Sequence, residues 1–258
     1  MTVKNVAIVT GAAQGMGYEV FHALAARGYV TIGIDIQKEK LQKVKEIVEQ
    51  DNVAVEIFGA DVSDSTRVNE IIDQVYKTYG SIDVLVNAAG VLSQGEVTTL
   101  SDEDWERTFA VNTTGVFHIS RAVCNRMKEN QQGAVVTISS NAASVPRTSM
   151  SAYCASKAAS LMFTKCLGLE MASYGIRCNI VSPGATDTEM QRAFWNEEAD
   201  IEKGIKGIPE QYRVGIPLQK IANTSDITEA VLFLLSENAR HITMNNIVVD
   251  GGATLGAQ

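Results

Sequence analysis

Short apolar runs alternate along the chain with longer segments in which apolar residues recur at helical spacing. The runs hold Val, Ile and Leu in succession rather than at every second position, which is typical of strands buried on both faces. Strands are predicted at 6–9, 29–34, 53–58, 82–86, 134–139, 177–181 and 246–249. Helices are predicted at 15–27, 37–50, 65–79, 102–130 and 152–173. Because strands separated by helices join through right-handed crossovers, we expect an α/β fold with one doubly wound parallel sheet and helices on both faces.

The domain organisation is expected to be simple. With 258 residues, 45 % of them apolar, the chain can bury a large core without disulfides. No linker rich in Ser, Pro and Gly divides it, so residues 1–258 are predicted to form one domain. At about 190–217 Gly and Pro interrupt the helical pieces, and we name these residues the lid segment. An insertion at the carboxyl edge of a sheet suits a mobile lid over a site.

The composition excludes several classes of protein. The net charge is −8, and without a basic stripe we expect no binding to nucleic acid. An anionic ligand must then be held by local donors. We expect no membrane span and no signal peptide, and therefore a cytoplasmic protein. The 3 His residues lack metal-ligand spacing, so no metal is expected. The 4 Cys residues are predicted to be buried or half-buried small side chains in a reducing compartment: Cys124, Cys154, Cys166 and Cys178.

A glycine-rich turn follows the first predicted strand and opens the first helix. Its sequence, TGAAQGMG, spans 10–17. Glycines permit a tight turn and close approach to the backbone, and the helix N-terminus offers free N–H groups to a pyrophosphate. Such a string is weak evidence alone, but here it has the strand before it and the helix after it. The turn predicts a dinucleotide site in a Rossmann-like fold.

Asp35 ends the next predicted strand, where a carboxylate can accept hydrogen bonds from both hydroxyls of the adenosine ribose. The same charge would repel a 2′-phosphate, and neither Ile36 nor Gln37 offers a cation to offset that repulsion. We therefore expect NAD rather than NADP as the cofactor. The alternative interpretation is that Asp35 caps the following helix.

Tyr153 and Lys157 form a YxxxK pair on one face of a predicted helix, and Ser140 ends the strand before it. Oxidising an alcohol by hydride transfer requires a base for the hydroxyl proton. A phenol is a poor base at neutral pH unless a cation favours its ionised form. We expect Lys157 to supply that cation and to lower the pKa of Tyr153, while Ser140 positions the reacting oxygen.

Taken together, these residues resemble the short-chain dehydrogenase/reductase family over essentially the whole chain. NAAG at 87–90, Asn112 and SPG at 182–184 also fall in the family's order and spacing. The resemblance implies that Asn112 holds a water that relays protons to Lys157, completing a tetrad with Ser140 and Tyr153. It also implies a set of cofactor contacts besides Asp35, Tyr153 and Lys157: Gly11, Gln14, Gly15, Met16, Gly17, Ile36, Asp61, Val62, Asn87, Ala88, Gly90, Pro183, Thr186 and Thr188.

A narrower resemblance is carried by NAAGVL, DWERTFAVN, VPRTSMSAYCASKAA, RCNIVSPGATDTEMQRAFW, GIPL and HITMNNIVVDGGATLGA. These stretches are similar to members of the family that oxidise a dihydroxylated dihydrobenzoate to an aromatic catechol acid for siderophores. The resemblance implies a small anionic cyclic diol as substrate. The gain of aromaticity would pull the reaction towards product, in agreement with an oxidising cofactor.

A substrate carboxylate requires a local cation in this acidic chain. Arg147, between Ser140 and Tyr153, is one candidate, because a guanidinium can bind a carboxylate through two hydrogen bonds. Arg192, beside Gln191 in the lid segment, is the other. A solvated surface arginine is the alternative for each. Apolar walls are expected from Met150 and from Phe194 or Trp195. Related enzymes often carry Arg after NAAGVL, where this chain has Ser93.

Assembly is also suggested by the pattern. The two longest predicted helices are apolar on more than one face, through Val116, Phe117, Ile119, Leu161, Phe163 and Leu167. A helix of that kind needs a partner besides its own sheet, so we expect an oligomer. The family resemblance implies a homotetramer.

Two other functions remain open at this point. One is a different enzyme on the same scaffold, such as an oxoacyl-thioester reductase or a sugar-alcohol dehydrogenase. Asp35 disfavours an NADP-dependent reductase, and Arg147 favours a small acid. The other is a regulator that senses NAD(H) without turnover, which would be free to lose Ser140, Tyr153 or Lys157.

Overall fold

A seven-stranded parallel sheet forms the centre of the protein, with strand order β3-β2-β1-β4-β5-β6-β7. The computed structural model describes residues 5–50, 53, 55–193 and 198–257. The strands are β1 (Val6–Thr10), β2 (Val30–Asp35), β3 (Val55–Gly59), β4 (Val84–Asn87), β5 (Gly133–Ile138), β6 (Ile176–Pro183) and β7 (Asn246–Val249). Each predicted strand is confirmed within a few residues, and so is the doubly wound α/β architecture.

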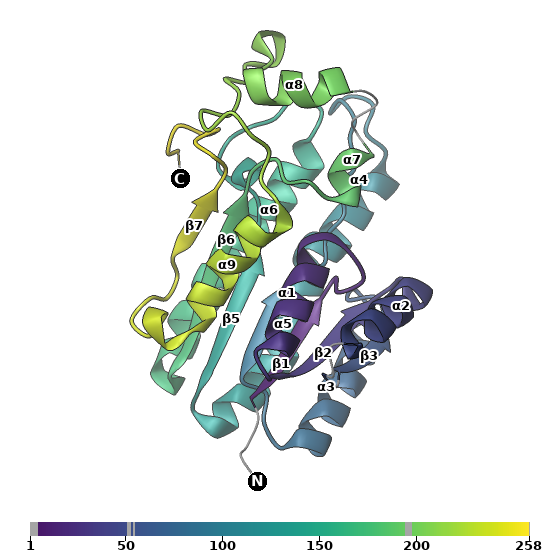
Figure 1. Cartoon of the computed structure of the whole chain (residues 1–258), viewed down its shortest axis with the longest axis vertical. Helices are drawn as coiled ribbons and strands as arrows, with labels where there is room; N and C mark the ends of the chain where they lie inside the picture. The colour runs from purple at the N-terminus through teal and green to yellow at the C-terminus, as the bar shows by residue number, and fades with distance from the viewer. Residues whose placement is uncertain (1–4, 51–52, 54, 194–197, 258) are drawn as a thin grey trace.

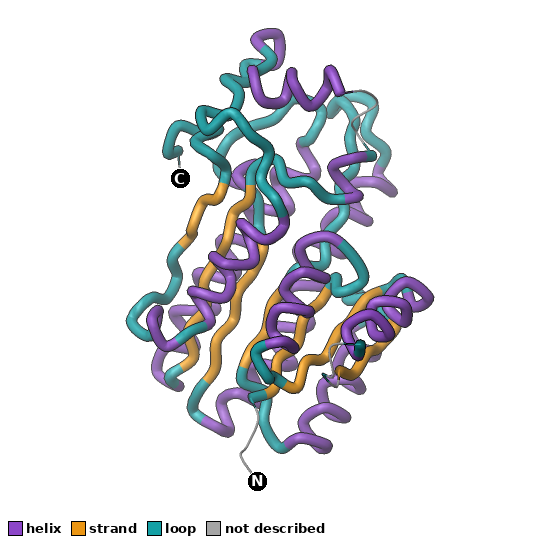
Figure 2. Tube along the Cα trace, viewed as in Figure 1, coloured by secondary structure: helices purple, strands orange, loops and turns teal. Residues whose placement is uncertain are grey.

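Helices cover both faces of the sheet (Figures 1 and 2). One face carries α1 (Gly15–Ala26), α2 (Lys38–Glu49) and α9 (Thr224–Leu235), and the other carries α3 (Ser65–Tyr79), α5 (Val116–Asn130) and α6 (Ser151–Met171). The shorter helices of the described residues are α4 (Asp102–Phe109), α7 (Glu189–Arg192) and α8 (Glu198–Lys206), with 3-10 turns η2 (Asn141–Ala143), η3 (Ala172–Tyr174), η4 (Pro209–Gln211) and η5 (Glu237–Ala239). No helix in the described part of the chain has the length and apolar character that crossing a bilayer requires.

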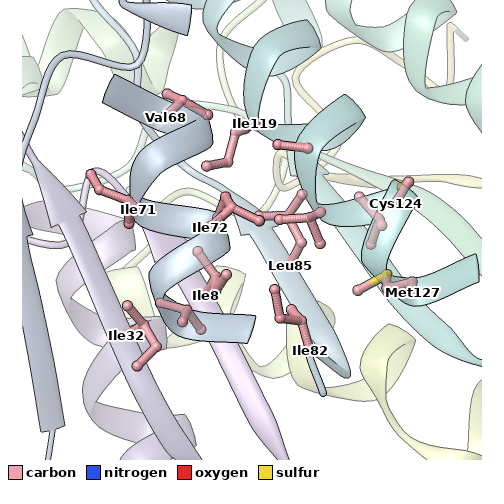
Figure 3. Close-up of a cluster of buried hydrophobic side chains, with 14 of the residues drawn as sticks. Ile8, Ile32, Val68, Ile71, Ile72, Ile82, Leu85, Ile119, Cys124 and Met127 are labelled. Atoms are coloured by element: carbon pink, nitrogen blue, oxygen red, sulfur yellow. The ribbon is translucent and has the colours of Figure 1, made fainter. Parts of the chain in front are cut away.

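The continuous apolar strands are explained by a core on each side of the sheet. In β1, Ile8 packs into the cluster beneath α3 and α5, whereas its neighbours Ala7 and Val9 pack beneath α1 and α9. Figure 3 shows the first cluster, where Ile71 and Ile72 of α3 meet side chains of the sheet and of α5. Both faces of each central strand are therefore buried, so polar and apolar residues do not alternate along these strands.

The predicted helix at 102–130 is divided into three pieces. A π-helical segment, η1 (Ala110–Gly115), separates α4 from α5. Such wide turns are often found at functional sites. The segment holds Asn112, whose side chain is fully buried, so the interruption sets the direction of a side chain that the sequence pattern alone places inside a regular helix.

The carboxyl ends of the strands meet at one edge of the sheet, where α7 and α8 lie beyond them (Figure 1). The chain order reverses between β1 and β4, because β1 pairs with β2 on one side and with β4 on the other. Ligands of open α/β sheets bind in the crevice at this switch point. Thr10, Asp35 and Asn87 end β1, β2 and β4 at this edge.

Candidate active site

The glycine-rich turn packs against the end of β4 so closely that side chains are excluded. A Cβ at Gly17 would lie 2.1 Å from the carbonyl oxygen of Gly11, and one at Gly11 would lie 2.7 Å from the Ala89 nitrogen. Gly11 also has a φ of 69°. The Thr10 hydroxyl accepts hydrogen bonds from the Ala88 and Ala89 N–H groups at 3.1 and 3.2 Å. The turn is thus held beside the NAAG segment, with the start of α1 facing the crevice.

Asp35 is buried at the end of β2, and both of its carboxylate oxygens accept backbone hydrogen bonds. Ala13 N–H donates to one at 3.0 Å, and Gln37 N–H donates to the other at 2.9 Å. The second bond agrees with a role in turning the chain into α2. Asp35 also lines the crevice, so its charge faces any ligand there.

The crevice has a volume of about 550 Å³. Predicted cofactor residues that line it are Gly11, Gln14, Gly15, Met16, Gly17, Asp35, Ile36, Asp61, Val62, Ala88, Gly90 and Thr188. Asn87 does not line it: its amide donates to Ser120 and Thr137 within the core at 3.0 and 3.2 Å. Asn87 therefore ties β4 to β5 and α5 beneath the crevice, while its buried Oδ1 has no hydrogen-bond partner among the described residues.

A second cavity, of about 170 Å³, adjoins the crevice. Met16, Leu92, Thr188 and Met190 line both spaces. Predicted residues found in the second cavity are Ser140, Arg147, Met150, Tyr153, Pro183, Thr186 and Gln191. Ser140 and Tyr153 thus lie where a small ligand in this cavity would meet a ligand in the crevice.

Tyr153 and Lys157 lie on the same face of α6. The Lys157 ammonium is 5.8 Å from the centroid of the Tyr153 ring and donates a hydrogen bond to the Ile138 carbonyl at 3.0 Å. Lys157 is only 6 % exposed. Gly90 lies next to this amine, since a Cβ added at Gly90 would be 3.3 Å from the Lys157 Nζ atom. The ammonium therefore lies against the floor of the crevice, although it does not line the open space.

Burial dominates the protonation of this pair. It lowers the pKa of Lys157 to about 8, so the amine is still largely protonated at neutral pH. Burial also raises the pKa of Tyr153, an effect that hydrogen bonding by Ser140 partly opposes. The expected lowering of the Tyr153 pKa by Lys157 is not seen in the chain by itself: burial raises that pKa, and the group that lowers it is Ser140.

The side chains of Ser140 and Asn112 are held by hydrogen bonds, local for Ser140 and long-range for Asn112. Ser140 follows β5 and caps η2, where its hydroxyl accepts from the Ala142 N–H at 3.1 Å. The Asn112 amide donates to the Val91 carbonyl at 2.9 Å and to the Ser156 hydroxyl at 3.0 Å, and its oxygen accepts from the Val91 N–H at 2.8 Å. Asn112 thus joins the π-helical segment to α6 and to the loop after β4.

Arginines expected to hold a substrate differ sharply in their surroundings. Arg147 is half-buried in the second cavity. The Arg192 side chain is 65 % exposed, and its guanidinium binds both oxygens of Asp187 at 2.6 and 2.8 Å. It does not line the cavity. Phe194 and Trp195 lie outside the described residues.

Residues 5–199 match the short chain dehydrogenase family. The chain belongs to the short-chain dehydrogenase family. Its members use a nicotinamide cofactor, and the glycine cradle, where a Cβ would collide with the backbone, leaves space for such a dinucleotide.

Among relatives within this family, the chain is 54 % identical to 2,3-dihydro-2,3-dihydroxybenzoate dehydrogenase of Bacillus subtilis, covering 98 % of this chain and 97 % of that protein. It is 44 % identical to the Escherichia coli protein of the same name, covering 98 % of each chain. A crystal structure of gox2181 superposes with a TM-score of 0.91 at 29 % identity, covering 98 % of this chain and 96 % of that one.

Among the lining residues of this short-chain dehydrogenase that were not predicted are Met190, Arg107 and Arg213. Met190 lies between the two spaces, Arg107 lines the crevice, and Arg213 lines the second cavity. Arg107 also donates to the Ser93 hydroxyl at 3.3 Å, so a cation from α4 reaches the segment after NAAGVL. Arg213 lies in the lid segment, where its sequence neighbours give no sign that it faces inward.

Two further expectations can be compared with the structure. Cys124 and Cys178 are buried and Cys154 is half-buried, as predicted, but Cys166 is exposed on α6. Of the apolar residues expected at an interface, Val116, Ile119, Leu161 and Leu167 are buried within the chain, whereas Phe117 remains exposed. The prediction for Cys166 was wrong because helical spacing does not reveal which faces the chain itself covers.

Proposed function

We propose that this chain oxidises 2,3-dihydro-2,3-dihydroxybenzoate to 2,3-dihydroxybenzoate, with NAD as the hydride acceptor. The observation that carries the proposal is Arg147, a half-buried cation beside Ser140 and Tyr153 in a cavity that adjoins the cofactor crevice. A long acyl chain has no anionic group to pair with the Arg147 guanidinium, whereas a small ring acid has a carboxylate. The named relatives support the same substrate.

In the proposed mechanism, the chain's residues handle the proton and the position of the substrate. Ser140 holds the reacting oxygen, and the Tyr153 phenol oxygen takes the hydroxyl proton. Bound NAD supplies the acceptor for the hydride. Lys157, with its ammonium near the Tyr153 ring, favours the ionised phenol once a ligand fills the crevice. Asn112 holds a water that relays protons to Lys157. The resulting ketone tautomerises when a ring proton moves from carbon to oxygen, and aromaticity makes this step favourable.

The preference for NAD rests on Asp35. Its carboxylate lines the crevice, and the two residues that follow it are uncharged. A 2′-phosphate would be repelled there. Pro183, Thr186 and Thr188 are proposed to hold the nicotinamide end, because they line the cavity beside Tyr153.

Assembly and location complete the proposal: a homotetramer in the cytoplasm. Support for association comes from exposed apolar side chains on α5 and α6, namely Phe117, Met162 and Leu169. Met162 and Leu169 are 56 % and 69 % exposed, which is costly for large apolar side chains on one helix face unless another surface covers them.

The decisive experiment is a turnover panel. NADH formation is measured with 2,3-dihydro-2,3-dihydroxybenzoate, with the same ring lacking its carboxylate, and with acyclic alcohols. We expect the ring acid to give the highest kcat/KM. Reduction of an oxoacyl thioester with NADPH at a higher kcat/KM would contradict the proposal, and so would NAD binding without turnover of any alcohol.

A further inference from the structure

Two guanidinium groups line the same small cavity. Arg147 comes from the loop between η2 and α6, and Arg213 from the lid segment after η4. Both side chains are half-buried. Burial lowers the pKa of Arg213, and the positive charge of Arg147 lowers it further. Two like charges are thus brought into one partly desolvated space from distant parts of the sequence.

Neither guanidinium has a carboxylate partner among the described residues. Several other arginines of the chain are paired: Arg67 with Glu70, Arg126 with Asp73, and Arg192 with Asp187. Asp250 exerts some attraction on Arg147, but its own oxygens accept hydrogen bonds from Asn141, Gly252 and Thr254. A buried or half-buried pair of like charges is unfavourable unless an anion joins it.

A tight backbone turn holds Arg213 in place. The Ile208 N–H donates to the Arg213 carbonyl at 2.8 Å, and the Arg213 N–H donates back at 3.1 Å. Gly207 and Gly215 flank this pairing with φ values of 101° and 87°. A Cβ at Gly215 would lie 2.4 Å from the Ile205 carbonyl oxygen. The two backbone segments of this turn can approach so closely only with glycine at these positions. Their pairing fixes the backbone of Arg213, from which its side chain extends.

We propose that Arg213 is a specificity-determining residue that binds the ring carboxylate of the substrate together with Arg147. The acid is then bound by one arginine of the lid segment and by one from the loop between η2 and α6. This inference rests on the proposed function for the identity of the acid. A carboxylate has two oxygens and can accept hydrogen bonds from two guanidinium groups. Its single negative charge relieves the repulsion between the two arginines, so binding should depend on both.

The test compares binding of an acid and of its neutral counterpart without turnover. Dissociation constants for 2,3-dihydroxybenzoate and for catechol are measured by calorimetry in the presence of NAD for the parent chain, Arg213→Gln, Arg147→Gln and the double variant. We expect Arg213→Gln to weaken binding of the acid roughly 10- to 100-fold, while catechol and NAD bind as before. Arg213→Lys should restore part of the affinity, because it keeps the charge but loses the planar fork.

Lys206→Gln is the matched control, because Lys206 is an exposed cation on α8 that pairs with Glu202. It should leave the affinity for the acid unchanged. Unchanged affinity for the acid in Arg213→Gln, or equal losses for the acid and catechol, would overturn the role of Arg213. If the parent binds the acid through both arginines but does not oxidise the dihydro acid, the proposed function fails while the carboxylate site stands.

Discussion

The ammonium group of Lys157 lies 5.8 Å from the centroid of the Tyr153 ring, one helical turn further along α6. Burial affects the two groups in opposite senses: it raises the pKa of the phenol and lowers the pKa of the amine. Both shifts favour neutral forms. For Tyr153 to act as a base, the charge of bound ligands must favour its ionised form. Proton transfer is therefore linked to occupation of the crevice.

Replacing Tyr153 by Phe should remove the base and keep the shape of the ring. We expect kcat with the ring acid to fall by about 10²- to 10⁴-fold, while NAD binding stays near that of the parent. Steady-state kinetics and calorimetry check the two parts. Tyr174→Phe, which changes a tyrosine packed under Lys128, is the control and should behave as the parent. Turnover of Tyr153→Phe close to the parent's would rule out the proposed base.

Lys157 should make stability depend on pH. Its folded pKa of about 8 lies below its ordinary value of 10.5. The unfolded chain therefore holds more protons between pH 8 and 10.5, and the free energy of unfolding rises with pH across that window. Relative to Lys157→Met, the parent should gain about 3 kcal/mol over this range. Urea titrations at several pH values measure the difference.

The exposed Lys43 provides a comparison for this effect. Lys43→Met should follow the same pH dependence as the parent, because it leaves the buried Lys157 amine in place. An unfolding free energy that changes identically with pH in the parent and in Lys157→Met would show that the Lys157 amine is not desolvated in the folded chain.

Asp35→Ser should shift the enzyme towards NADP. Removing the carboxylate removes its repulsion of a 2′-phosphate, so the ratio of kcat/KM for NADP to that for NAD should rise at least about tenfold. Parallel kinetics with the two cofactors give the ratio. Asp73→Ser alters an acid on the outer surface, paired with Arg126, and should leave it unchanged. A ratio insensitive to Asp35 would remove this residue from cofactor selection.

The exposed apolar side chains of Phe117, Met162 and Leu169 should be covered by a second copy of the chain. A Leu169→Glu variant places a charge in that contact, and we expect sedimentation velocity to show smaller species than the parent, down to a 27.8 kDa monomer. Ile47→Glu, at an exposed apolar position on α2, should keep the parent's assembly. A monomeric parent would contradict the proposal.

Most of the fold was predictable because its signals are local. The strand before the glycine turn, the acid at the end of β2 and the spacing of Tyr153 and Lys157 all lie within short stretches of sequence, and each is found where it was expected. The π-helical interruption at Asn112 was missed, because the residues around it are compatible with a regular helix. Its cause is tertiary, because the Asn112 side chain forms hydrogen bonds with Val91 and Ser156.

The sequence by itself determined the alternation of strands and helices, the glycine cradle and the types of residue available for chemistry, since these follow from local sterics and periodic burial. Only the tertiary structure decided which charges face the cavity. Arg192 and Arg213 both occur in the lid segment, yet one is paired with Asp187 in solvent and the other lines the cavity with Arg147. That difference depends on contacts between distant parts of the chain, and such contacts leave no periodic trace in the sequence.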